Sequence, residues 1–307
     1  MPENGIQSHI ATLTELRGNP VIVYASVIND DGVRIAYECL RRMGHVSQLD
    51  VVLSTGGGTI TAARRLALLL REYASRIAIL VPYRARSAGT LLCLSANELT
   101  LGPMAELGPL DPQVGTAGAM PPDAPPAISA QDIQAFPAMA KDWFGVERAE
   151  DRLQVLALVA QRIFPTSLSA FYRFDRLARQ VADELLAYQL PDAGADVRQG
   201  IVQQLVAGYA AHDYAITRAE ARCMGLQVRV PPDREEQCLW DLEQALRLQF
   251  AAKPGEVERS VTALIASASV IAREVYQLAD GSPGAPGTPS SAGNRLRSSW
   301  EFEECAL

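Results

Sequence analysis

The sequence has little that would bind metal, nucleic acid or membrane. Its five cysteines are scattered without a C-x-x-C pair, which predicts reduced thiols and no zinc site. Acidic residues outnumber basic ones by 35 to 28, and the resulting charge of −7 does not favour binding to nucleic acid. The longest uncharged apolar stretch, residues 260–272, falls well short of the ~20 residues of a membrane helix. Since the N-terminus also lacks a signal-peptide pattern, we expect a cytoplasmic protein without metal or cofactor.

Groups that accept a proton near neutral pH are also scarce. The chain contains three histidines and two lysines, namely His9, His45, His212, Lys141 and Lys253. A general base usually comes from these residue types or from a carboxylate. The list of candidate bases is therefore short.

The first third of the chain has the pattern of an α/β fold. Between residues 20 and 113, short β-branched runs alternate with segments of helical periodicity. This alternation predicts strands at 21–27, 49–53, 76–81 and 98–101, and helices at 33–43, 60–73 and 87–96. Regular strand–helix alternation is typical of a largely parallel sheet with helices on both faces.

The composition changes after residue 113. A Pro-rich stretch over 114–131 predicts a loop or lid, and the segments after it read as mainly helical, with 261–278 helical or mixed. Residues 280–294 are rich in Gly, Pro and Ser, which predicts a flexible linker. We therefore expect one domain over 1–279, followed by a linker and tail over 280–307.

Two loops that follow predicted strands carry candidate chemistry. The first, Leu53–Thr59, contains Gly56, Gly57 and Gly58 directly before a helix, where bare backbone N–H groups can face an oxyanion or a phosphate. It is neither a Walker A loop nor a G-x-G-x-x-G motif, so a nucleotide site is not favoured. A tight turn that merely needs glycine explains the same pattern.

The second loop places Ser87 at a strand-to-helix turn between small residues. Small neighbours let a carbonyl approach, and the helix N-terminus stabilises developing negative charge, so Ser87 is a candidate nucleophile. A serine that only caps the following helix would look the same. Because both loops follow parallel strands, we expect them to open at one edge of the sheet, where α/β sites form.

These segments resemble a known family. The Gly-Gly after the second strand, the A-R-S-A-G-T run over 85–90 and L-G-P-L-D-P-Q over 107–113 resemble the serine dehydrogenase proteinase family, relatives of signal peptide peptidase A in the ClpP/crotonase superfamily. Weaker similarity covers 160–230, including H-D-Y-A-I at 212–216. The resemblance implies a spiral of ββα units with a mainly helical C-terminal part, and assembly into trimers, hexamers or larger rings.

The resemblance also implies roles for particular residues. Ser87 matches the nucleophile, and Gly56 or Gly57 together with the N–H of Ala88 matches the oxyanion hole. No histidine follows the serine at the ClpP-type spacing. Signal peptide peptidase-type enzymes use a lysine as the base.

Two candidates for the general base are left open, Lys141 and His212. A solvated surface ion pair with Asp142 explains Lys141 without catalysis, and a helix-end or packing role explains His212. Asp111 either orients the base or caps a turn.

The sequence-based hypothesis is an ATP-independent serine hydrolase that acts on peptides or proteins, with membrane-surface contact left open. Two alternatives share the fold. One is a crotonase-like acyl-CoA enzyme, for which no CoA-binding signature is present, and the other is an inactive oligomeric scaffold that has lost its base.

Overall fold

Four apolar runs form a parallel sheet at the centre of the molecule. They are strands β1 (Val21–Ala25), β2 (Val46–Ser54), β3 (Ala74–Val81) and β5 (Glu98–Leu101), which pair in the order β5-β3-β2-β1. In this computed structural model the described residues are 3–111, 113–114, 128–146, 148, 150–151, 153–154, 157–158, 165–251, 259–278 and 296–305. The strand–helix alternation predicted between residues 20 and 101 is confirmed.

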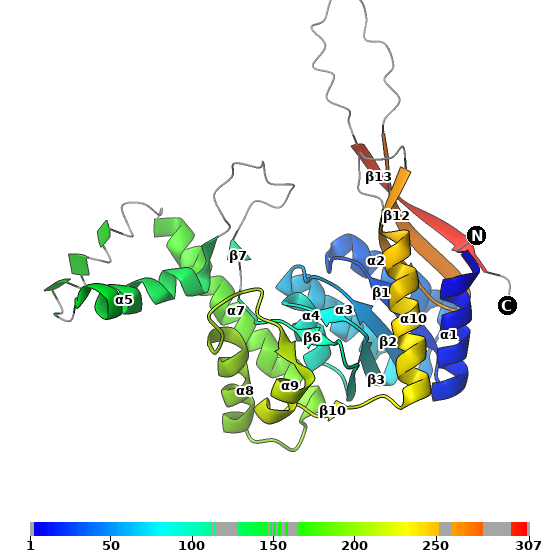
Figure 1. Cartoon of the computed structure of the whole chain (residues 1–307), viewed down its shortest axis with the longest axis horizontal. Coiled ribbons are helices and arrows are strands. Elements are labelled where there is room, and N and C mark those ends of the chain that lie inside the picture. The colour runs from blue at the N-terminus through cyan, green and yellow to red at the C-terminus, as the bar shows by residue number, and fades with distance from the viewer. Residues whose placement is uncertain are drawn as a thin grey trace, which may run out of the picture.

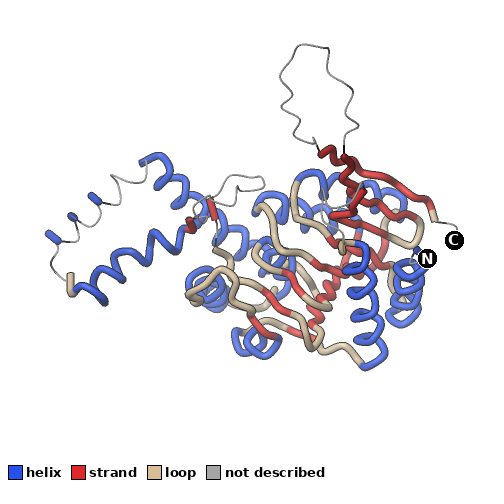
Figure 2. The backbone as a smooth tube through the Cα atoms, turned by 45° about the horizontal axis from the view of Figure 1, so that its top comes forward, coloured by secondary structure: helices blue, strands red, loops and turns tan. Residues whose placement is uncertain are grey.

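Helices cover both faces of this sheet (Figures 1 and 2). One face carries α2 (Asp30–Met43), α3 (Ile60–Tyr73) and α4 (Ala88–Leu94), and the other carries α1 (Glu3–Arg17) and α10 (Asp233–Gln249). Each face buries its own apolar cluster, because consecutive strand side chains point to opposite sides. Val23 and Val52, for example, pack toward α1 and α10, whereas Tyr24 and Leu53 pack toward α2 and α3.

The large sheet continues beyond β1 as antiparallel strands, and here the sequence-based prediction was wrong. Residues 261–278, predicted to be helical or mixed, belong to β11 (Arg259–Ala266) and β12 (Val270–Leu278). β11 pairs with β1, and β13 (Leu296–Glu304) pairs with β12 along its whole length. At the opposite edge, the short strand β10 (Val228–Arg229) pairs with β5.

The middle of the chain is mainly helical and lies next to α4, at one side of the molecule (Figure 1). It contains α5 (Ala130–Phe144), α7 (Pro165–Gln189), α8 (Ala195–Ala207) and α9 (Arg218–Met224). α7 packs on α3 and α4, while α5 extends away from the body of the molecule. A short hairpin of β7 (Gln113–Val114) and β8 (Ile128–Ser129) precedes α5. Most of the Pro-rich stretch, 115–127, and the predicted linker at 280–294 lie outside the described residues.

A small second sheet brings three distant segments together. Strand β6 (Glu106–Leu107) lies between β4 (Arg84–Ala85) and β9 (Ile216–Thr217), parallel to the first and antiparallel to the second. Ser87 follows β4, Asp111 follows β6, and His212 precedes β9. This sheet therefore positions all three side chains in one region.

Candidate active site

Ser87 occupies a strained turn between β4 and α4. Its φ of 51° makes it the one non-glycine residue with a positive φ in the described part of the chain. Its hydroxyl makes no capping hydrogen bond to the helix that follows, so the helix-cap explanation of this serine has no support. A non-glycine residue held in such a conformation costs about 1–3 kcal/mol, and such strain gathers at functional sites.

Buried hydrogen bonds hold this turn in place. The Thr90 hydroxyl is fully buried on α4 and lies 2.9 Å from the Ala85 carbonyl oxygen and 2.8 Å from that of Gly108. The Thr90 hydroxyl oxygen in turn accepts a hydrogen bond from the Gly108 N–H at 2.9 Å. Thr90 therefore ties the strand before Ser87 to the segment that leads to Asp111.

An ion pair beside the candidate nucleophile adds a second tie between the same segments. The Arg86 Nε donates to Glu106 Oε1 at 2.7 Å, and Nη2 lies 2.6 Å from the same oxygen. A Cβ on Gly108 would lie 3.0 Å from the Arg86 Cβ, so the arginine stem packs directly on the glycine backbone. The residue before Ser87 is thus fixed by both its backbone and its side chain.

The glycine loop packs directly against Ser87. A Cβ on Gly57 would lie 3.1 Å from both the Arg86 carbonyl oxygen and the Ser87 Cβ, and Gly57 has a φ of 121°. At Gly58 a Cβ would lie 2.0 Å from the carbonyl oxygen of Ile28. Both positions therefore require glycine for space and, since each φ is positive, for backbone conformation.

One backbone N–H group of the glycine loop is used inside the protein. The Gly57 N–H donates to the Thr55 hydroxyl at 3.1 Å, and the Gly57 carbonyl accepts from the Ile28 N–H at 2.8 Å. By contrast, the N–H groups of Gly56, Gly58 and Ala88 donate no hydrogen bond within the described part of the chain. These three are among the backbone N–H groups near Ser87 that are not used within the described residues.

Ser87, Asp111 and His212 line one cavity of about 460 Å³ together with the glycine loop. Its remaining walls come from Thr59, Ile60 and Thr61 at the start of α3 and from Phe174 and Leu177 on α7. Asp111 is 3% exposed, and its Oδ1 lies 3.5 Å from the backbone N–H of Gln131. The structure thus brings the candidate nucleophile, a histidine and a buried carboxylate to one place.

The His212 side chain has an unsatisfied nitrogen. Its Nδ1 is buried and has no hydrogen-bond partner among the described residues. A buried polar atom without a partner costs about 1–3 kcal/mol, so such an atom calls for an explanation. Hydrogen bonds between catalytic groups are often incomplete until substrate binds.

Aromatic packing holds the loop that carries His212. The rings of Tyr209 and Tyr214, on either side of the histidine in the chain, stack with centroids 4.6 Å apart. The Tyr214 hydroxyl donates to Glu220 at 2.6 Å, and Glu220 also completes the capping box of α9 with Thr217. Burial raises the pKa of Tyr209.

Lys141, the other candidate base, does not lie with these residues. It is exposed in the last turn of α5. It lines neither the cavity at Ser87 nor a neighbouring cavity of about 540 Å³, which Asp111 and His212 also line. Figure 1 shows α5 extending away from α4, whose first turn follows Ser87. Of the two candidates, only His212 shares a cavity with the serine.

Several site residues were not identified from the sequence. Phe174 and Leu177 stand one turn apart on α7, a spacing that does not distinguish a cavity wall from a core face. Gly58 was named only as part of its loop, because the bond from Gly57 to Thr55 is invisible in a sequence. No group of three or more His, Cys, Asp or Glu residues in the described ranges has the geometry to hold a metal ion.

Comparison with known proteins agrees with the geometry. Residues 9–127, which contain the glycine loop, Ser87 and Asp111, match the model of the ClpP-like SDH-type serine proteinases. This part of the chain is similar to that family. The mixed α/β architecture with its large sheet is consistent with a ClpP-like fold.

Two curated relatives come from Methanocaldococcus jannaschii, and both are described only as uncharacterized. MJ0137 is 26% identical over 229 residues, which cover 74% of this chain and 68% of that protein. MJ1495 is 25% identical over 206 residues, which cover 67% of this chain and 59% of that protein. The family supports a serine peptidase-like function, while the relatives add no activity. No helix in the described ranges is long and apolar enough to cross a membrane.

Proposed function

We propose that the protein is a serine hydrolase that cleaves peptide bonds without ATP or metal. The observation that carries this proposal is the cavity shared by Ser87, Asp111 and His212 beside unused backbone N–H groups. The family of residues 9–127 supports the reaction type. The ββα spiral, and assembly of several copies into a ring, are part of the same proposal because members of this superfamily share them.

In the proposed mechanism His212 accepts the proton of the Ser87 hydroxyl as the oxygen attacks the substrate carbonyl carbon. The N–H groups of Ala88 and of Gly58 or Gly56 donate to the oxyanion that forms. His212 then gives its proton to the leaving amine, which departs as the C–N bond breaks and leaves an acyl-enzyme. A water molecule, deprotonated by the same histidine, hydrolyses this ester and restores Ser87.

Asp111 has a positioning role in this scheme. It lines the same two cavities as His212 and is almost fully buried. When the imidazole becomes charged, a buried carboxylate next to it stabilises the cation and selects its orientation. The unsatisfied Nδ1 of His212 is the group that such a carboxylate would accept from.

Labelling with a fluorophosphonate tests the proposal. Attack of Ser87 on phosphorus expels fluoride and adds a defined mass, so one adduct is expected on the wild type and none on Ser87→Ala. His212→Ala should slow labelling by about 10⁴-fold or more, whereas Lys141→Met, with its side chain outside the cavity, should label at the wild-type rate. An adduct that persists in Ser87→Ala, or a loss of labelling in Lys141→Met alone, would overturn this assignment.

A further inference from the structure

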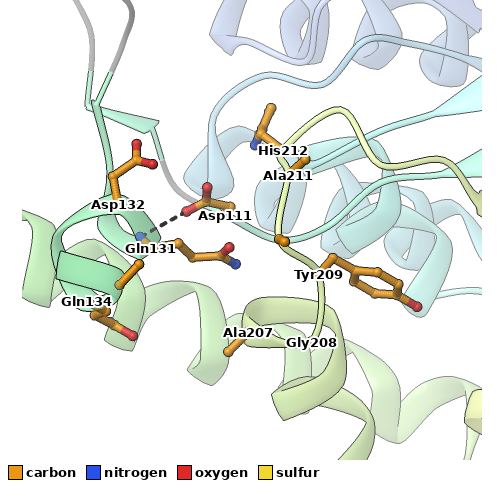
Figure 3. Close-up of a pocket in the computed structure, with 11 residues that line it drawn as sticks. Asp111, Gln131, Asp132, Gln134, Ala207, Gly208, Tyr209, Ala211 and His212 are labelled. Atoms are coloured by element: carbon orange, nitrogen blue, oxygen red, sulfur yellow. Dashed lines mark hydrogen bonds between the residues drawn. The ribbon is translucent and has the colours of Figure 1, made fainter. Parts of the chain in front are cut away.

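Gln131, at the start of α5, contacts the segments that carry the candidate aspartate and histidine. Its backbone nitrogen lies 3.5 Å from Asp111 Oδ1 (Figure 3). Its side-chain amide donates to the backbone carbonyl oxygen of Val206, in the last turn of α8. Since α8 leads directly into the loop of His212, one residue joins the buried carboxylate to the segment that holds the imidazole.

The end of α8 depends on partners from outside the helix. Carbonyl groups in the last turn of a helix have no N–H partner within it, so other segments must supply one. The Leu205 carbonyl accepts from the Leu110 N–H at 2.8 Å, and the Val206 carbonyl accepts from Gln131. Leu110, Leu205 and Val206 are buried, so water would not readily replace a lost partner. The end of α8 is therefore fixed by the segment of Asp111 and by α5.

The loop of His212 starts at this end of α8 and runs to β9. It is braced internally by the stacked rings of Tyr209 and Tyr214. The Tyr214 N–H also donates to the Ala211 carbonyl at 3.2 Å, which closes a turn around His212. A loop braced in this way follows the helix end to which it is attached. Displacement of that end would move the imidazole, and a misplacement of about 1 Å can slow an enzyme about 10²-fold.

We propose that Gln131 is a positioning residue for the pair of Asp111 and His212. Its amide holds the end of α8, and with it the histidine loop, against the segment of the carboxylate. The inference rests on the proposed function and adds a residue that does not itself line the Ser87 cavity. If Gln131 served only to cap α8, its loss would lower stability and leave the candidate base in place.

Gln131→Met tests this role, because methionine keeps the length of the side chain and removes the amide that donates to Val206. Fluorophosphonate labelling of Ser87 should be at least about tenfold slower in this variant than in the wild type. Gln134→Met is the matched control. Gln134 lies on the same helix and lines the same neighbouring cavity as Gln131, but among the described contacts it does not bond Val206. This variant should be labelled within about twofold of the wild-type rate.

A double-mutant cycle with His212→Ala separates positioning from a general loss of structure. A residue that acts through the histidine has no further effect once the imidazole is gone. Gln131→Met should therefore change the labelling rate of His212→Ala by no more than about twofold. Loosening of the Ser87 turn or of the whole domain would instead slow labelling equally in both backgrounds. Equal slowing in both, or equal slowing in Gln131→Met and Gln134→Met, would refute the positioning role.

Imidazole NMR provides a readout that does not need activity. The chain has three histidines, so protein with isotope-labelled histidine gives three side-chain signals, and the one lost in His212→Ala belongs to His212. Gln131→Met should shift or broaden this signal and leave those of His9 and His45 unchanged. Gln134→Met should leave all three in place. An unchanged His212 signal in Gln131→Met would contradict the inference.

The two readouts separate failure of this inference from failure of the proposed function. If wild-type Ser87 is labelled, and Gln131→Met keeps the wild-type rate and His212 signal, only the positioning role is wrong. If Ser87 is not labelled in folded wild-type protein, the hydrolase assignment fails and the catalytic role of Gln131 fails with it. The His212 signal then shows separately whether Gln131 holds the loop.

Discussion

Replacement of Thr90 tests how the nucleophile turn is held. Thr90→Val keeps the shape of the side chain and removes the hydroxyl, which bonds Gly108 and Ala85 inside the protein. The Gly108 N–H would then be buried without a partner, at a cost of about 1–3 kcal/mol. The single hydroxyl proton serves one carbonyl at a time, so its loss removes about one further hydrogen bond, or about 1 kcal/mol. We expect Thr90→Val to lose about 2–4 kcal/mol of stability.

Thr90→Ser provides the matched control, because it keeps the hydroxyl and removes one buried methyl group. That deletion should cost about 1 kcal/mol. Denaturant unfolding of the three proteins, followed by the rate of fluorophosphonate labelling at Ser87, gives both readouts. The order of stability should be wild type, Thr90→Ser, Thr90→Val, and labelling should slow in the same order. A valine variant at least as stable as the serine variant would show that the hydroxyl does not hold the turn.

Two further predictions concern buried charges that do not line the Ser87 cavity. Burial, only partly opposed by a hydrogen bond from Ser54, raises the pKa of Glu243. The contribution of Glu243 to stability is therefore lost as pH rises through that pKa. One oxygen of its carboxylate also has no hydrogen-bond partner among the described residues. Glu243→Gln should therefore raise the melting temperature at pH 7, with a gain that shrinks toward pH 4; a lower melting temperature at pH 7 would contradict this. Arg17 bonds the fully buried Asp50 and also Glu235 and Glu98, so Arg17→Met should cost about 3–5 kcal/mol at pH 7. Although burial opposes it, the hydrogen bond from Arg17 lowers the pKa of Glu98, so this part of the contribution is lost as pH falls through that pKa and the loss in Arg17→Met should be smaller in acid. Urea unfolding at both pH values measures this, and an equal loss at pH 7 and pH 4 would count against the charge explanation.

Local features of the sequence were sufficient to predict the parallel part of the sheet and the two loops at its edge. The glycine loop and the Ser87 turn each carry a local signal in a short window, although contacts with Ile28, Glu106 and Gly108, which are distant in sequence, hold them in place. The segment 261–278 was misread because its small residues, alanine and serine, blur the alternation that marks a strand. Its strands exist because β11 pairs with β1, a contact between distant parts of the chain.

The spacing of residues in the sequence could not decide between Lys141 and His212, because their positions also depend on contacts between distant parts of the chain. The position of His212 depends on the pairing of β9 with β6, which two residues on each strand specify weakly. Lys141 sits nearer to Ser87 in sequence, yet α5 carries it away from the cavity. Tertiary pairing, rather than distance along the chain, decides which candidate base shares a cavity with the serine.

The small sheet of β4, β6 and β9 also sets an order of assembly during synthesis. Chains emerge N-terminus first and fold as their parts become available, so the segments bearing Ser87 and Asp111 are made long before β9. A serine hydroxyl without its base is a weak nucleophile. Under the proposed mechanism the nascent chain would remain harmless to itself and its neighbours until His212 arrives. The distribution of the catalytic groups along the chain would then act as a safeguard that needs no removable pro-segment.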